Sequence, residues 1–164
     1  MTEERAQCLL CRVGPERLAV RVTDVHKVVG AARLCRLPRL PRAVAGITQH
    51  RGRIVTVFDA RDLLFGESAK DYEPTRAMDA RVVVLERMQR HLAIAVDAVD
   101  EIESLRLGPD LPPGPSPALR VAEHRGQAVF AVDGDRLLEM MLGSTGEAAS
   151  TPRAGNFTPG RGSV

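Results

Sequence analysis

The stretch Ile47-Thr48-Gln49-His50-Arg51-Gly52-Arg53-Ile54-Val55-Thr56-Val57-Phe58-Asp59 is an apolar run interrupted by an Arg-Gly pair. It returns 74 residues later as Val121-Ala122-Glu123-His124-Arg125-Gly126-Gln127-Ala128-Val129-Phe130-Ala131-Val132-Asp133. Between residues 47–64 and 121–138, seven of the eighteen positions are identical. One constant offset is typical of an internal repeat, so the chain is expected to contain two similar structural units.

Each copy of this stretch predicts a β-hairpin. The Gly of the Arg-Gly pair supplies the positive φ that a tight hairpin turn requires, and β-branched residues on both sides favour strands. Further apolar runs extend the pattern, and the remaining predicted strands lie at residues 7–13, 18–29 with a bend, 32–37, 82–85 and 91–103. The sequence therefore predicts an all-β fold of two five-stranded barrels related by the repeat.

The repeat also predicts the boundaries of the units. The first barrel is expected at about 7–65 and the second at about 80–134, followed by a short helix at about 135–142. Residues 143–164 are mostly Gly, Ser, Thr, Pro and Ala, which predicts a disordered tail after a domain that spans 1–142. A unit of roughly seventy residues is marginal for a core of its own, so the two units are expected to pack together.

Composition restricts the class of protein. Aromatic residues make up only 3% and Trp is absent, so the core must be aliphatic. The net charge of +2 is too small to attract nucleic acid by itself. No run of 18 apolar residues and no signal-peptide pattern is found, which favours a cytoplasmic protein.

No constellation of reactive residues predicts catalysis. Cys8 and Cys11 have the spacing of half a zinc site, but no second Cys or His pair follows, and buried thiols are the better interpretation of both. The odd cysteine Cys35 argues against a disulfide framework. The four histidines follow no recognisable catalytic order with carboxylates. We therefore expect a binding module with no catalytic residue, cofactor or metal.

The ordered set of motifs in residues 37–59 resembles the signature of CheW-like domains. It has the proline pair Pro38 and Pro41, an apolar-Gly-apolar step at Gly46, the Arg51-Gly52 turn and a β run that ends at Asp59. Residues 81–85, 91–103 and 127–138 are similar to the family's second barrel, so the resemblance covers about 7–142. It implies two intertwined SH3-like barrels in a non-enzymatic adaptor, which couples chemoreceptors to a CheA-type histidine kinase at membrane-associated receptor arrays.

The resemblance also suggests partner-binding residues. Arg51 corresponds to an arginine near the groove where the receptor's helical tip docks, and its guanidinium could donate to carboxylates or carbonyls there. The alternative is that Arg51 only caps its own turn, because Arg125 repeats it. The full candidate set is Arg51, His50, Val25, Lys27, Val28, Gly46 and Gly52. The two valines could equally be core, Lys27 a solvated charge, and the glycines backbone requirements.

Departures from the family pattern leave the partner open. This chain has Gln49-His50-Arg51-Gly52 where the family usually has Asn-Leu-Arg-Gly, and Lys27 where a Glu is frequent. A scaffold that binds only receptor or only kinase is therefore an alternative. A second alternative is nucleic-acid binding by a basic stripe, because arginines at 33, 36, 39 and 42 would align in an extended chain. No aromatic residue accompanies them for base stacking, and a solvated loop would explain them equally.

Overall fold

The computed structural model describes residues 4–41, 43–66 and 80–150, with side chains described as far as Gly143. Ten strands, two 3-10 turns and two α-helices fill these ranges. In chain order the elements are β1 (Glu4–Val13), β2 (Glu16–Arg21), η1 (Val22–Asp24), β3 (Val25–Gly30), η2 (Ala31–Arg33), β4 (Val44–His50), β5 (Arg53–Asp59), α1 (Ala60–Phe65), β6 (Arg81–Arg87), β7 (Arg90–Val96), β8 (Ala98–Leu107), β9 (Leu119–His124), β10 (Gln127–Val132) and α2 (Gly134–Ser150). The predicted all-β fold with two five-stranded units and a C-terminal helix is confirmed.

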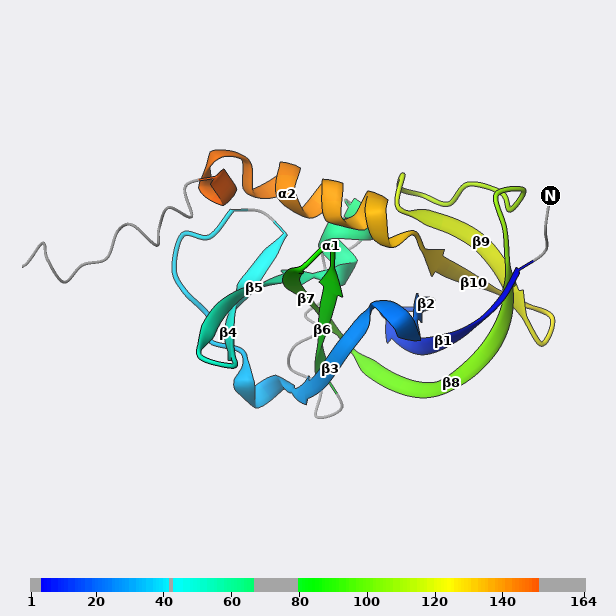
Figure 1. The fold of residues 1–164 in the computed structure, drawn as a ribbon, viewed down its shortest axis with the longest axis horizontal. Helices are drawn as coiled ribbons and strands as arrows, with labels where there is room; N and C mark the ends of the chain where they lie inside the picture. The colour runs from blue at the N-terminus through cyan, green and yellow to red at the C-terminus, as the bar shows by residue number, and fades with distance from the viewer. Residues whose placement is uncertain (1–3, 42, 67–79, 151–164) are drawn as a thin grey trace, which may run out of the picture.

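The strands form two sheets that exchange segments between the halves of the chain (Figure 1). One sheet has the order β8-β1-β2-β10-β9 and the other has the order β3-β6-β7-β5-β4. Each sheet thus takes two strands from one half and three from the other. The exchange is the intertwining that the family resemblance implied, and neither sheet coincides with the contiguous ranges 7–65 and 80–134. Similar halves can pair with each other as readily as within themselves.

The two sheets have the same register. β5 and β7 are parallel, with Val57 opposite Ala93, and 74 residues away Ala131 lies opposite Ala19 in the pairing of β10 with β2. The sheets also share the pairing next to their tight turns, where Glu86 faces His91 in one sheet and Arg12 faces Arg17 in the other. The sequence repeat is therefore a repeat of strand pairing as well.

Both Arg-Gly pairs form two-residue hairpin turns. Arg51 and Gly52 have φ of 52° and 76°, and Arg125 and Gly126 have φ of 53° and 80°. Positive φ at both central residues defines a type I′ turn, whose twist matches that of the flanking strands. The predicted hairpins are confirmed.

The strand predicted at residues 32–37 is wrong. Ala31–Arg33 is a 3-10 turn, and only Cys35 pairs with β4, donating to Ile47 at 2.8 Å and accepting from it at 2.9 Å. Pro38 follows directly and has no amide hydrogen to extend a ladder. The single bridge nevertheless connects the chain after β3 to β4, at the opposite end of the sheet order.

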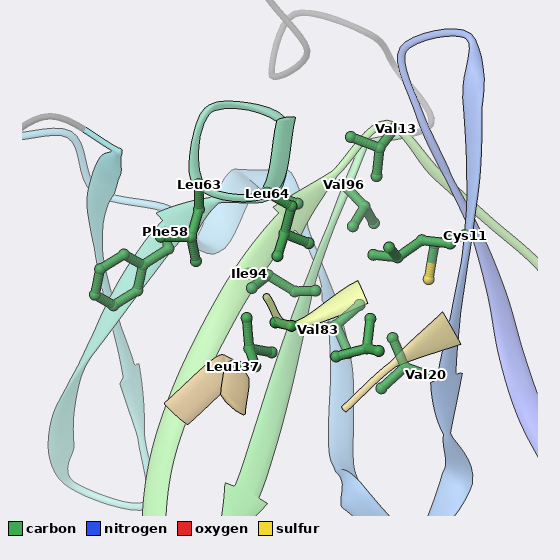
Figure 2. Close-up of a cluster of buried hydrophobic side chains, with 14 of the residues drawn as sticks. Cys11, Val13, Val20, Phe58, Leu63, Leu64, Val83, Ile94, Val96 and Leu137 are labelled. Atoms are coloured by element: carbon green, nitrogen blue, oxygen red, sulfur yellow. The ribbon is translucent and has the colours of Figure 1, made fainter. Parts of the chain in front are cut away.

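Three apolar clusters hold the sheets. One lies on each sheet's own inner face, with Leu10 and Val129 in the first and Val57 and Val84 in the second. The third and largest lies between the sheets (Figure 2). The residues labelled there come from both sheets and both helices, namely Cys11, Val13, Val20, Phe58, Leu63, Leu64, Val83, Ile94, Val96 and Leu137. Each sheet therefore has a small core of its own, and the largest cluster joins the two sheets.

Each hairpin is followed by a helix capped by an aspartate. Asp59 accepts hydrogen bonds from the amides of Arg61 and Asp62, and Asp133 accepts from those of Asp135 and Arg136. This satisfies amides at the helix start that have no partner within the helix.

Helix α2 runs along one side of the molecule, from β10 toward β5 (Figure 1). Its residues Leu137 and Met141 enter the central cluster. The helix extends to Ser150, so the start of the predicted disordered tail is helical instead. The apolar contacts of the first turns provide a template from which the helix continues. The rest of that prediction, residues 151–164, lies outside the described residues.

Candidate functional site

All the predicted partner-binding residues fall in the sheet β3-β6-β7-β5-β4. Val25, Lys27 and Val28 lie on β3, Gly46 and His50 lie on β4, and Arg51 with Gly52 forms the turn after it. β3 and β4 are the first and last strands of this sheet. The rings of His26 and His50 nevertheless lie 4.7 Å apart, so the sheet curls until its two ends meet. Closure of the sheet therefore joins residues that are distant in sequence.

Arg51 projects from the turn. Its side chain is exposed, and in the described part of the chain its guanidinium has no hydrogen bond or ion pair. The alternative in which Arg51 caps its own turn therefore receives no support. Its repeat partner Arg125 differs, because its Nη2 lies 3.8 Å from Oε1 of Glu103.

β3 presents a mixed surface. Lys27 and Val28 are exposed, and Val28 is one of the few large apolar residues that are, at 36%. Val25 packs against the central cluster, which favours a structural role for it. The bulge between Val25 and Lys27 changes which face each side chain occupies.

Gly46 is needed by the backbone. It is buried where the chain after β3 crosses β4, and a Cβ there would overlap the carbonyl oxygen of Cys35. Gly52 is exposed and has open space where a Cβ would lie, so only its positive φ favours glycine. Of the two glycines, Gly46 thus has no surface through which a partner could contact it.

His50 is the centre of an unexpected cluster. It is only 8% exposed, and its ring contacts those of His26 and His91 at centroid distances of 4.7 and 5.3 Å. The rings of His26 and His91 lie 5.0 Å apart. Glu86 lies beside them, with Oε1 at 3.1 Å from Nδ1 of His26 and 3.8 Å from Nε2 of His91.

The electrostatic environment keeps His50 neutral. Burial lowers its pKa, and nearby His26, Arg51, His91 and Lys27 lower it further. A neutral imidazole offers a nitrogen lone pair as an acceptor or metal ligand. The same contributions show that Lys27 and Arg51 both lie near His50, so the predicted basic residues share one area.

His26, His91 and Glu86 were not predicted as site residues. They come from β3, β7 and β6, and the three histidines are far apart in sequence. The repeat contains one useful signal: His50 has a counterpart in His124, whereas the position of His91 is taken by Arg17 in the other copy. Such a difference between duplicated positions indicates that one copy has specialised.

The equivalent place in the other sheet is closed by polar contacts. Nε2 of His124 lies 2.9 Å from Oε1 of Glu103, and Arg17 Nη1 lies 3.5 Å from Nδ1 of His124. The hydrogen bond with His124 lowers the pKa of Glu103, and the charges of Arg125 and Arg17 act in the same direction. Both nitrogens of this histidine are therefore engaged.

The basic stripe does not have the geometry that its spacing predicted. Arg33, Arg36 and Arg39 are exposed, but Arg33 ends a 3-10 turn and Arg39 has φ of 57°. A polyproline-like alignment needs φ near −75° throughout. Arg42 lies outside the described residues.

The three cysteines lie in different surroundings. Cys8 and Cys11 are buried in different apolar clusters, which confirms the interpretation as buried thiols. Burial raises the pKa of Cys11 to about 12, so its thiol stays protonated at neutral pH. Cys35 is exposed. Among the helices of the described ranges, none is both long and apolar enough to cross a membrane.

Comparison with known proteins agrees with this architecture. A model of the CheW-like domain matches residues 7–142. The chain is 28% identical over 130 residues to the chemotaxis protein CheW of Klebsiella aerogenes, covering 79% of this chain and 74% of that protein. The crystal structure of the scaffolding protein TtCheW from Thermoanaerobacter tengcongensis superposes with a TM-score of 0.63 at 21% identity, covering 79% of this chain and 89% of that one.

Proposed function

Because the chain belongs to the CheW-like domain family, whose members are non-enzymatic scaffolds, we propose that it couples chemoreceptors to a CheA-type histidine kinase. The observation that carries this proposal is a reversal of charge at equivalent exposed positions, with Lys27 on β3 and Glu101 on β8. β3 and β8 are the edge strands of the two sheets, and they occupy equivalent positions in the repeat. A scaffold needs two such surfaces, because it must hold two partners at once.

The surface on β3 is basic. Lys27 and Arg51 are exposed and both lie near His50. Val28 on β3 and Ile54 on β5 are exposed apolar side chains, Ile54 at 66%. Exposed cations together with exposed apolar side chains suit a helical partner that carries carboxylates beside an apolar stripe. We assign the helical tip of a receptor to this surface, with Arg51 as its main polar contact.

The surface on β8 is acidic. Glu101 and Ile102 replace Lys27 and Val28 at the offset of the repeat, and Ile102 is 53% exposed. The opposite charge would disfavour a partner selected by the basic surface. We assign the regulatory domain of the kinase to this sheet, docked through apolar side chains at its edge.

The proposed location follows from these partners. The protein would lie in the cytoplasm and be recruited to membrane-associated receptor arrays through receptor contacts. Each contact with a single partner is expected to bury a modest area, so repeated contacts within an array would provide much of the total affinity.

A scaffold specialised for a single partner is the alternative that the site favours most. Lys27 and His50 both depart from the family pattern, and the buried ring of His50 lies near Lys27 and Arg51. A chain that has changed its receptor surface and retained its kinase surface would bind kinase alone. The nucleic-acid alternative lacks a continuous stripe, because the chain is not extended through Arg33 and Arg39.

Calorimetric titration with the two partners tests the proposal. The full chain is titrated with the regulatory domain of a CheA-type kinase from the same genome, and separately with a receptor cytoplasmic fragment. Micromolar or tighter binding to both supports the coupling role. Binding to one partner identifies the single-partner alternative, and binding to neither refutes the adaptor proposal. Titration with duplex DNA at low salt tests the nucleic-acid alternative.

A further inference from the structure

The three imidazoles around His50 have the composition and placement of a metal site. One nitrogen from each of His26, His50 and His91 lies within 4.8 Å of the other two. The residues come from β3, β4 and β7 of one closed sheet, so rigid strands hold all three. We propose that these histidines bind a divalent transition-metal ion, with Zn²⁺ the best match to the ligand set.

The distances allow the ion to be bound with small side-chain movements. A zinc–nitrogen bond is about 2.0–2.1 Å, so ligand nitrogens in a tetrahedral site lie roughly 3.3 Å apart. The nitrogens must therefore approach by about 1.5 Å or less from the largest separation. His50 is almost fully buried, whereas the side chains of His26 and His91 are 19% and 25% exposed. The two outer rings can turn toward the fixed one, and an ion can enter from solvent.

Hydrogen bonding leaves the required atoms free. Within the described ranges, Nε2 of His50 and Nε2 of His91 are buried and have no hydrogen-bond partner. Buried polar atoms are nearly always paired, so two unpaired ring nitrogens in one cluster need a physical cause. A bound cation would satisfy both, because a neutral imidazole donates its lone pair to a metal.

Glu86 supplies negative charge where a site with three neutral ligands needs it. Its carboxylate lies 3.1 Å from Nδ1 of His26. Such a contact can fix the tautomer and orientation of a ligating histidine. It also offsets the positive charge of Lys27 and Arg51, which both lie near His50.

The other sheet provides a natural comparison. At the offset of the repeat, Asp100 and Arg17 replace His26 and His91, and only the histidine at the turn is retained as His124. That histidine is already engaged by Glu103 and Arg17. If a histidine were required only to build the hairpin turn, each sheet would need a single histidine at that position. The two additional rings therefore point to a function confined to the sheet β3-β6-β7-β5-β4.

Metal titration of the untagged chain tests the proposal. Calorimetry with Zn²⁺ is expected to show one site per chain, and Co²⁺ is expected to give the intense visible absorption of tetrahedral nitrogen ligation. His91→Gln should weaken Zn²⁺ binding at least tenfold, and His124→Gln is the matched control that should leave it unchanged. Equal affinity in both variants, or no stoichiometric binding to the wild-type chain, would overturn the proposal.

Two further measurements distinguish the histidine site from a thiol site and from a loss of folding. Cys35→Ser should retain full affinity, because the exposed thiol is not a ligand here; loss of binding would assign the metal to sulfur instead. His26→Gln provides a second partly exposed variant in case His91→Gln fails to fold, and thermal unfolding of each apo variant identifies that failure. Kinase and receptor binding measured in a chelating buffer separates this proposal from the adaptor role, since either can fail alone.

Discussion

Arg17 occupies in one sheet the position that His91 occupies in the other. Each lies opposite its repeat-equivalent partner, Arg12 or Glu86, at the same place in the strand register. Arg17 approaches His124, whereas His91 faces His26 and His50. Two differences between duplicated positions, Arg17 for His91 and Asp100 for His26, therefore separate an ion-paired turn from a cluster of imidazoles on a common scaffold.

Arg51→Glu should abolish receptor binding and spare kinase binding. The side chain is exposed and makes no contact that the fold needs among the described residues, so the stability should change by less than about 0.5 kcal/mol. Reversing a charge at a complementary interface places like charges together, and we expect the receptor affinity to fall by at least roughly tenfold.

Arg125→Glu is the matched control, because it changes the same turn in the other sheet. Calorimetry on both variants against receptor fragment and kinase domain is the measurement. If Arg125→Glu, rather than Arg51→Glu, removes receptor binding, the assignment of surfaces is reversed.

Gly46→Ala should destabilise the fold strongly. The added Cβ would overlap the backbone carbonyl of Cys35, and a backbone atom cannot rotate away. We expect the free energy of unfolding to fall by about 2 kcal/mol or more, measured by urea denaturation. Gly30→Ala is the control: it has φ of −71° and open space around its Cβ position, so its effect should be small. Equal stability of the two variants would contradict the close approach.

Arg87→Met should loosen the contact between the halves of the chain. Arg87 Nη1 lies 2.7 Å from Oδ1 of Asp24, which is 5% exposed, and Arg87 Nε lies 2.9 Å from Oδ1 of Asp135. Removing the guanidinium leaves the carboxylate of Asp24 buried without its cation. We expect a loss of about 2 kcal/mol in the free energy of unfolding.

A double-mutant cycle isolates this interaction. Asp24→Asn combined with Arg87→Met should cost less than the sum of the single changes, because the double variant lacks the buried carboxylate that Arg87→Met alone leaves unpaired. Arg12→Met serves as the exposed control, since the side chain of Arg12 is 53% exposed in its pair with Asp100. Strict additivity would show that the Asp24 contact contributes no coupling.

Glu103→Gln should reduce the sensitivity of the protein to acid. The hydrogen bond with His124 lowers the pKa of Glu103 in the folded state below its unfolded value of about 4.3. Its contribution is fully present above that value and is lost as the pH falls through the lower folded pKa. The variant should start less stable at pH 6 and lose less stability between pH 5 and pH 3 than the wild type, as measured by urea denaturation. If the wild type and the variant lost the same free energy of unfolding between pH 5 and pH 3, the Glu103–His124 pair would not contribute to acid sensitivity.

The hairpins were predictable because their determinants are local. The Arg51-Gly52 and Arg125-Gly126 turns, with apolar strands on both sides, specify type I′ geometry within a dozen residues. The capping aspartates Asp59 and Asp133 are local in the same sense. The prediction of a strand at 32–37 was wrong because the apolar residues there do not indicate that only Cys35 pairs with another strand.

The exchange of strands and the histidine cluster required information that is not local. A repeat shows that the two halves are alike. It does not show whether the strand beside β1 comes from the same half, as β2 does, or from the other half, as β8 does. His26, His50 and His91 meet only because the sheet closes from β3 to β4. The resemblance to a barrel-forming family implied that the sheet closes, but neither it nor the spacing of the histidines in the chain predicts that these three rings meet there.

The exchange of strands between the sheets restricts how the two halves of the chain can evolve. A cut within residues 67–79 would leave two fragments, each holding only two or three strands of either sheet, so neither should be stable alone. Mixed together, the fragments should reassemble by complementation, because each supplies what the other sheet lacks. Recombination at the same place between two paralogues would make every barrel a hybrid of both parents. The halves must therefore evolve as a matched pair, even though they began as copies.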